Sequence, residues 1–285
     1  MLTYCVVVPA HNEEAFLSGM LDSLLHQTHL PTQIVIVNDN STDTTEELID
    51  WYCSNHPIIR KLNRVAESTR LPGSKVVAAF HAGVDHITES WDFLVKLDAD
   101  LILPEHYFQS ISEAFESNPK LGIAGGFAYE EQNGVWALNH TMNKDHVRGA
   151  FKSYTRECFT TMGGLRSSMG WDTIDELLAR YYGFEVLTLE SLHIKHLRPT
   201  ASSYSKKAKY MQGEAMYKMR YDPGIAFLTM AKASWKQKKA SYFVDSIIGY
   251  AKAHFDGTRA AVSPEEGKFI RKYRWQNILA KITGK

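Results

Sequence analysis

Asp98 and Asp100 are two carboxylates separated by one residue, directly after the mostly apolar stretch "WDFLVKL" (91–97). Side chains two positions apart in an extended strand point to the same side. At roughly 5 Å apart, two such charges repel by ~3 kcal/mol at an effective dielectric constant of about 20. The spacing therefore predicts a cation between them, or side chains that turn apart. Hard oxygen donors suit Mg²⁺ or Mn²⁺, which commonly also bind substrate phosphates, whereas a solvated turn is the alternative.

Two other turns carry residues suited to nucleotide binding. Asp39 ends "QIVIVND" (33–39), where a carboxylate can accept hydrogen bonds from a base or a ribose hydroxyl, as the acidic residue of dinucleotide folds does. The alternative is an Asx turn that caps the next helix. Lys75 in "PGSKVVAA" begins a predicted helix and could face a phosphate there, or be a plain surface lysine. In "VVVPAHNEE", Glu13 or Asn12 is either a ligand contact or a helix cap.

Strand and helix patterns alternate through the first half of the chain. Apolar runs predict four strands and a weaker fifth, at residues 4–10, 33–39, 91–97, 121–129 and 58–62. Helical spacing of apolar residues predicts helices at 13–26, 43–53 and 75–87. This alternation predicts an α/β fold, with a mainly parallel sheet covered by helices on both faces. Ligands of such sheets gather beyond the carboxyl ends of the strands, where all three polar turns would fall.

The alternation weakens from about residue 130. The pattern predicts a long loop at 130–147, a short helix within 153–164, a helix within 172–184 and a strand at 185–196. After Pro199 come three or four helical, Lys-rich segments. We therefore predict a domain of residues 1–200, followed by a basic helical extension of residues 201–285.

Taken together, the motifs resemble the family two glycosyltransferases of the GT-A fold, as in bacterial enzymes of surface polysaccharide synthesis. The resemblance covers roughly residues 3–200, and its marks are "VVVPAHNEE", "VNDNSTD", "GSK" with "AAFHAG", "KLDAD", and "MGGL…GWDTIDELLARYYGFEV" ending in "HIKHLRPT". The resemblance implies metal-dependent transfer of a sugar from a nucleotide-diphosphate donor to an acceptor hydroxyl, with inversion at the anomeric carbon. A UDP-sugar is the expected donor, and a glycan or a lipid-linked molecule is the expected acceptor.

The resemblance also implies roles for individual residues. By matching position, the nucleotide would be bound by Pro9, Ala10, His11, Glu13, Asp39, Lys75 and Asp98. Asp100 would be the main ligand of Mn²⁺ or Mg²⁺. His196 would be a further ligand, since neutral imidazole binds Mn²⁺ and the family often has a histidine at the end of this strand. Without the resemblance, a histidine at a strand end is usually an ordinary surface or core residue.

An acceptor hydroxyl must lose a proton as it attacks, so a carboxylate is needed as general base. Asp172 in "GWDTIDE" is our choice, because it begins a helix after a glycine-rich turn and matches the family's base position. The sequence departs from the common Glu-Asp pair, with Trp171 where a glutamate is usual. Asp175 is therefore the rival base, and a plain N-cap is the structural alternative for Asp172.

The composition limits the other function classes. Three scattered cysteines in 285 residues and the lack of a basic leader predict a cytoplasmic protein, with the inner face of the membrane as a possible location. Residues 1–196 hold 14 Lys and Arg against 26 Asp and Glu, and residues 197–285 hold 18 against 6, so the parts carry −12 and +12. This asymmetry predicts either basic helices docked on an acidic body or contact with an anionic membrane.

The residues named for membrane contact are Lys236, Lys238, Lys239, Arg271, Lys272, Arg274, Trp235 and Phe243. A homodimer formed by the same helices is equally compatible, and no nucleic-acid partner is expected. Two other function classes stay open: a sugar nucleotidyltransferase and a non-catalytic nucleotide-sugar-binding protein. The first would be expected to have a Gly-rich amino-terminal loop with Arg and Lys, which "PAHNEEAF" does not provide.

Overall fold

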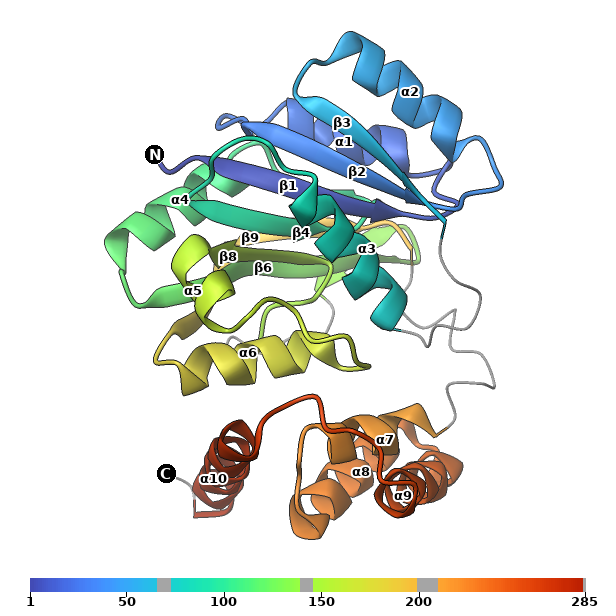
Figure 1. The fold of residues 1–285 in the computed structure, drawn as a ribbon, viewed down its shortest axis with the longest axis vertical. Coiled ribbons are helices and arrows are strands. Elements are labelled where there is room, and N and C mark those ends of the chain that lie inside the picture. Colours follow the sequence, from blue (N-terminus) through green and yellow to red (C-terminus); the bar gives the residue numbers. More distant parts are fainter. Residues whose placement is uncertain (66–72, 139–145, 199–209, 284–285) are drawn as a thin grey trace.

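The computed structural model of the chain describes residues 1–65, 73–138, 146–198 and 210–283 (Figure 1). Its strands are β1 Tyr4–Ala10, β2 Gln33–Asp39, β3 Ile59–Arg64, β4 Phe93–Leu97, β5 Leu101–Ile102, β6 Leu121–Gln132, β7 Val135–Leu138, β8 Phe151–Thr155 and β9 Glu185–His196. Its helices are α1 Leu17–Leu25, α2 Thr45–Asn55, α3 Ser74–Asp85, α4 Tyr107–Ser117, α5 Arg156–Thr161, α6 Trp171–Tyr181, α7 Met211–Lys218, α8 Pro223–Gln237, α9 Ala240–Phe255 and α10 Pro264–Thr283.

The strands form one mixed sheet in the order β3-β2-β1-β4-β8-β6-β9-β5, with β7 beside β6. The four strands from β3 to β4 are parallel, and the antiparallel pairs lie beyond β4. Strands β1 and β2 are buried along almost their whole length, as is typical of strands covered on both faces. The predicted α/β sheet flanked by helices is confirmed.

Helix α3 packs unusually close to the sheet because of Gly83. A Cβ atom at this position would lie 2.4 Å from Val7 Cγ1 and 2.8 Å from Val37 Cγ2, so only glycine fits. The helix connects β3 to the parallel strand β4 and therefore runs back across the sheet. Its first turn, with Lys75, thus lies at the carboxyl edge of the sheet.

Two predicted segments differ from the structure. The long loop predicted at 130–147 contains β7, which pairs with the extended end of β6. The short helix predicted within 153–164 is preceded by β8, whose register places Ser153 opposite both Val95 and Ala124. Both strands form through antiparallel pairing with other strands. The segment "SYTRECF" lacks an apolar–polar alternation strong enough to predict a strand from its sequence alone.

In the described residues after β9, 210–283, four helices lie beyond α6, within the three or four that the Lys-rich pattern predicted (Figure 1). The boundary predicted near residue 200 falls within 199–209, outside the described residues, and stays a prediction. Within the described part of the chain, no helix combines the length and the apolar character needed to cross a bilayer.

Candidate active site

A pocket of about 510 Å³ opens beyond the carboxyl ends of β1, β2 and β4. Its lining includes all seven residues predicted to bind the nucleotide and also Asp100: Pro9, Ala10, His11, Glu13, Asp39, Lys75, Asp98 and Asp100. Asn40 and Arg198 line it as well. The topology thus brings together residues that are up to 189 positions apart in the sequence, between Pro9 and Arg198.

The turns after β1 and β2 are linked by side chains. Asn12 and Asn40 both have positive φ angles, of 55° and 62°, which asparagine tolerates better than most residues. The Thr42 backbone N–H donates to Asn12 Oδ1 at 2.8 Å, and the Glu13 N–H donates to Thr45 Oγ1 at 2.8 Å. These bonds hold one wall of the pocket in a single arrangement.

Asp39 is fixed from both of its neighbouring strands. Arg64, opposite Asp39 in the β2–β3 register, places Nη1 3.1 Å from Asp39 Oδ1. His11 Nδ1 lies 2.8 Å from the backbone oxygen of Asp39, which positions the imidazole at the pocket wall. The Arg64 guanidinium thereby orients Oδ1 of Asp39. The other carboxylate oxygen of Asp39 can accept a hydrogen bond from a ligand in the pocket.

The two carboxylates of the D-x-D motif turn apart, each toward its own cation. Asp98 forms an ion pair with the buried ammonium of Lys96. Burial raises the pKa of the Asp98 carboxyl, and the Lys96 charge partly opposes this effect. Asp100 Oδ2 lies 3.4 Å from His196 Nε2 and 3.9 Å from Arg198 Nε. Burial acts to raise the pKa of Asp100, but His196 and Arg198 outweigh it and the pKa is lowered.

Asp100 and His196 lie close enough together to be tested as part of a set of metal ligands. Ligand atoms on adjacent octahedral positions about 2.1 Å from an ion lie about 3 Å apart, close to the 3.4 Å between Asp100 Oδ2 and His196 Nε2. Among the described residues, no group of three or more His, Cys, Asp and Glu side chains is arranged to hold a metal ion. The pair therefore fits an ion that takes its remaining ligands from water and phosphate, which is how Mg²⁺ is commonly bound.

His196 is also held on its far side. Arg148 Nη1 lies 3.2 Å from His196 Nδ1, and the Glu130 carboxylate lies 3.8 Å from the same nitrogen. Such partners on the far side of the ring fix the plane of the imidazole. The ring is thus oriented with Nε2 toward Asp100.

Arg198 is a charged pocket residue that the sequence analysis missed. Its Nη2 donates to Glu13 Oε2 at 2.5 Å, and its guanidinium lies 5.0 Å from the Phe16 ring centroid. Burial raises the pKa of Glu13, with Arg198 opposing. The sequence held a signal: Arg198 lies two positions after His196, a predicted ligand, directly beyond the end of β9.

The two candidate bases lie on α6 in different environments. Gly170 caps this helix with a left-handed φ of 73°, so Asp172 occupies the first turn and the N-cap alternative is wrong. Asp172 is half-buried. It does not line the pocket of about 510 Å³, and its role as base stays a prediction.

Asp175 is buried inside the domain, with 1% of its surface exposed. Its two carboxylate oxygens accept from Lys152 Nζ at 2.8 Å and from Tyr154 Oη at 2.6 Å. Lys152 also pairs with Glu176 at 3.1 Å and donates to the backbone oxygen of Asp172 at 2.5 Å. A base must reach an acceptor hydroxyl, so this geometry disfavours Asp175 and gives it a structural role instead.

The Trp171 ring lies close to both buried lysines, which are opposite each other in the β4–β8 register. Its ring centroid is 5.4 Å from Lys96 Nζ and 5.9 Å from Lys152 Nζ. A Cβ atom at Gly149 would lie 2.8 Å from this ring, so the glycine makes room for it. The indole therefore contacts both the lysine that pairs with Asp98 in the pocket and the lysine that pairs with Asp175 of α6.

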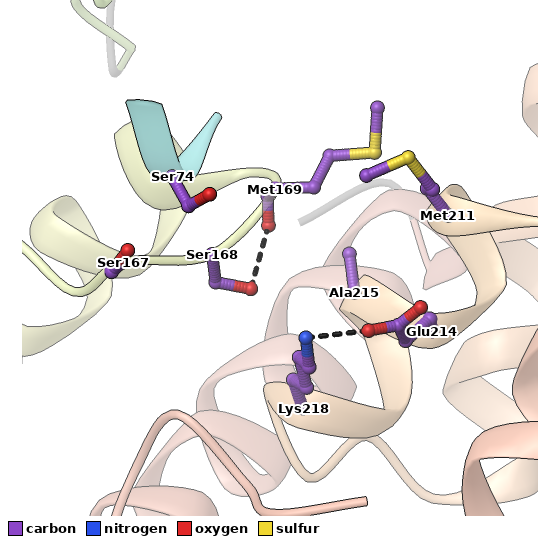
Figure 2. A pocket seen from close by; sticks show the side chains of 8 residues that line it. All are labelled: Ser74, Ser167, Ser168, Met169, Met211, Glu214, Ala215 and Lys218. Carbon is purple, nitrogen blue, oxygen red and sulfur yellow. Dashed lines mark hydrogen bonds and ion pairs between the residues drawn. The ribbon is translucent and has the colours of Figure 1, made fainter. Parts of the chain in front are cut away.

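A small cavity of about 30 Å³ lies between helix α7 and two segments next to the active site. It lies between Ser74 at the start of α3, the loop at 167–169 and helix α7 (Figure 2). The nearby Gly73 has a φ of 82°, and a Cβ atom there would lie 3.0 Å from the Ser168 backbone oxygen. Helix α7 thus adjoins both the helix that carries Lys75 and the loop that precedes Asp172.

Comparison with protein families matches residues 5–170 to the Glycosyl transferase family 2 model. The chain belongs to this family. An uncharacterized glycosyltransferase of Nostoc sp. is 29% identical over 118 residues, which cover 41% of the chain and 34% of that protein. A poly-beta-1,6-N-acetyl-D-glucosamine synthase of Staphylococcus epidermidis is 27% identical over 123 residues, covering 42% of the chain and 27% of the synthase. These matches thus span only about a third of their relatives' lengths.

Solved structures share the fold of this family 2 chain. The mannosyltransferase PcManGT from Pyrobaculum calidifontis, in complex with GDP-Man and Mn²⁺, superposes with a TM-score of 0.59 at 14% identity, covering 100% of this chain and 88% of that one. S. aureus TarS in complex with UDP-GlcNAc gives 0.58 at 15% identity, covering 76% and 64%. The predicted GT-A fold is therefore confirmed.

Proposed function

We propose that the chain is an inverting glycosyltransferase that moves a sugar from a nucleoside-diphosphate donor, with UDP-sugar expected, to an acceptor hydroxyl in polysaccharide or glycoconjugate assembly. The observation that carries this proposal is the convergence of eight predicted residues in one pocket of about 510 Å³ at the carboxyl edge of the sheet. Ligands of open α/β sheets bind at this edge. Membership of the family supports the same reading.

The donor would lie along the pocket from Asp39 to Asp100. Asp39, oriented by Arg64, accepts hydrogen bonds from the nucleoside. Lys75 and Arg198 supply positive charge for the diphosphate, and Arg198 exchanges its Glu13 partner for a phosphate oxygen. Asp100 and His196 would hold Mn²⁺ or Mg²⁺, and neighbours solved with Mn²⁺ support this assignment. Such an ion, when bound, neutralises charge that develops on the leaving diphosphate.

The acceptor oxygen attacks the anomeric carbon from the face opposite the diphosphate, and its proton passes to the carboxylate of Asp172. The bond between the sugar and the diphosphate breaks, and its electron pair stays with the diphosphate. Inversion follows from a single displacement of this kind. Asp172 lies in the first turn of α6 and is only half-buried, so its carboxylate is open to an acceptor hydroxyl.

Two measurements test the proposal. Calorimetric titration of the protein with UDP, with and without MnCl₂, is expected to show Mn²⁺-dependent binding that Asp100→Asn removes. The control variant Asp92→Asn, whose carboxylate pairs with Thr3 outside the pocket, is expected to bind as wild type does. Unchanged binding in Asp100→Asn would remove the metal assignment.

Incubation with UDP-sugars and candidate acceptors, followed by mass spectrometry, then separates the function classes. A transferase yields UDP and a glycosylated acceptor, a nucleotidyltransferase yields nucleoside triphosphate when pyrophosphate is added, and a binding protein yields neither. Asp172→Asn is expected to keep normal donor binding and to lose about 10²–10⁴-fold in turnover, the usual contribution of a general base. Full turnover in this variant would overturn the base assignment.

A further inference from the structure

Helix α9 buries its small residues and exposes its large ones. Ser246, Gly249 and Ala253 are its buried residues. A Cβ atom at Gly249 would lie 1.9 Å from the Tyr210 backbone oxygen, so the backbone beside α7 comes very close at this point. A surface helix normally turns its large apolar residues toward the core. In α9 the inward face holds the small residues, and the opposite face leaves its bulky side chains largely exposed.

The outward face of α9 is apolar along its whole length. Val244, Ile247, Ile248 and Phe255 follow one another at helical spacing, with exposures of 53%, 40%, 44% and 84%. Positions three and four apart share one face of a helix. These residues therefore form a continuous stripe rather than scattered exposed side chains.

Helix α8 extends this stripe. Ala231, Trp235, Phe243 and Val244 line one open groove between α8 and α9, and Trp235 is 87% exposed. The Phe227 ring lies 5.3 Å from the Phe243 ring, which joins the start of α8 to the same surface. We call the set Phe227, Trp235, Phe243, Val244, Ile247 and Ile248 the hairpin face.

The charge around the hairpin face is positive. Residues 223–255 contain five Lys and one Asp, with no Arg or Glu. Lys236, Lys238 and Lys239 are exposed at the junction of α8 and α9, and Lys238 and Lys239 line the same groove as Trp235. An apolar face with an exposed tryptophan and a rim of lysines is typical of a helix pair that lies in the interface of an anionic membrane.

We propose that the hairpin face binds the surface of a bilayer that contains anionic lipid, with α8 and α9 lying along the interface. A second copy of the chain fits less well, since a two-fold contact would place the same lysines against one another. Two arginines predicted for membrane contact are not part of this surface: Arg271 donates to the Arg220 backbone oxygen, and the Arg274 guanidinium lies 5.6 Å from the Tyr221 ring centroid.

The hairpin face is connected to the proposed active site through helix α7, which packs on the opposite, buried face of α9. Helix α9 packs on α7, and α7 adjoins Ser74 and the loop at 167–169 (Figure 2). Membrane binding would therefore bring the chain, with its donor pocket, to the surface of the bilayer. If the proposed function is correct, this arrangement favours an acceptor that is presented at the membrane, such as a lipid-linked glycan.

Vesicle co-sedimentation of the full chain tests the surface without donor or acceptor, so its result is independent of the proposed transferase activity. We expect the protein to pellet with phosphatidylcholine vesicles that contain phosphatidylglycerol, to remain in the supernatant with phosphatidylcholine alone, and to be released by high salt. Lys236→Gln/Lys238→Gln/Lys239→Gln should weaken binding by about a hundredfold, because each lysine near an anionic surface contributes about fivefold. The control Arg60→Gln/Lys120→Gln/Lys195→Gln removes three exposed charges from the other domain and should bind nearly as wild type does.

The apolar contribution is tested with Trp235→Ala and Ile248→Ser, with Trp51→Ala on α2 as the matched control, since Trp51 is also exposed at 58%. Because these side chains are exposed, the variants are expected to fold, which circular dichroism checks. The first two should bind more weakly and the control should not. Absence of binding to anionic vesicles, or equal loss in the control variants, would overturn the proposal. A dimer in light scattering that Ile248→Asp dissociates would assign the face to a second copy instead.

Discussion

Replacement of Lys152 by methionine is expected to destabilise the domain strongly. The Lys152 ammonium is fully buried and lies 2.8 Å from Asp175 and 3.1 Å from Glu176, whose side chains are 0% and 5% exposed. Methionine keeps much of the volume but leaves two buried carboxylates without their shared cation. Removal of one partner from a buried ion pair typically costs about 3–5 kcal/mol, because the remaining charge is left uncompensated.

That free energy corresponds to a clear shift in thermal unfolding. The entropy of unfolding scales with length at about 2.1 cal/mol/K per residue, which gives roughly 0.6 kcal/mol/K for this chain. The melting temperature should therefore fall by about 5–8 °C in differential scanning calorimetry. Lys120→Met, at an exposed position, is the control and should change it by less than about 1 °C, as surface substitutions usually do.

A double-mutant cycle makes the test specific. Asp175→Asn alone should also destabilise, but together with Lys152→Met it should cost less than the sum of the two single changes, because the second change removes a charge already left unpaired. Additive losses would show that Lys152 contributes through packing and not through charge. A melting temperature within about 2 °C of wild type in Lys152→Met would refute the ion-pair reasoning outright.

Three further changes have defined outcomes. Arg198→Gln should weaken UDP binding about 10–100-fold, as loss of a hydrogen bond to a charged group does, whereas Lys195→Gln, whose ammonium lies over Trp136, should leave calorimetric affinity unchanged. Gly73→Ala should lower stability in urea unfolding more than Gly134→Ala, since both have φ near 80° but only at Gly73 would the added Cβ atom lie within 3.0–3.3 Å of backbone atoms. The pKa of Glu176 is lowered to about 2, with Lys152 and His146 outweighing the opposing effect of burial. The charged Glu176 carboxylate therefore contributes to the free energy of unfolding above about pH 4.5, and this contribution is lost as the pH falls toward 2. The difference in unfolding free energy between wild type and Glu176→Gln should shrink over that range.

Much of the fold could be predicted because the inner strands are apolar runs with sharp polar ends. The bounds predicted for residues 4–10, 33–39 and 185–196 match β1, β2 and β9. Strands β7 and β8 were missed because they depend on pairing with β6 and β4, and the β4 partner lies far away in the sequence. Local pattern carries little information about such register.

For the candidate site, the pocket residues at strand ends could be predicted, but the residues that pair with them could not. Residues at strand ends were found because parallel topology alone brings them to one edge. Arg64 and Arg198 were missed, since their roles depend on which side chain lies opposite them in space: Asp39 for the first, and Glu13 and Asp100 for the second. Likewise, Asp175 stays a rival to Asp172 as base in the sequence, and its burial beside Lys152 is what argues against it.

Trp171 explains how the site can lack the carboxylate that resembling sequences carry at this position. Lys96 and Lys152 already have three carboxylate partners, Asp98, Asp175 and Glu176. These carboxylates already outnumber the two ammonium groups by one, and a further carboxylate beside the lysines would raise the excess of negative charge in this poorly solvated cluster to two. The indole instead offers each ammonium the negative face of a π-system, an attraction of about 2 kcal/mol when desolvated, without adding a formal charge. Trp171 therefore adds no further negative charge to this buried cluster and leaves Asp172 as the carboxylate in the first turn of α6, outside the Lys152 ion pairs.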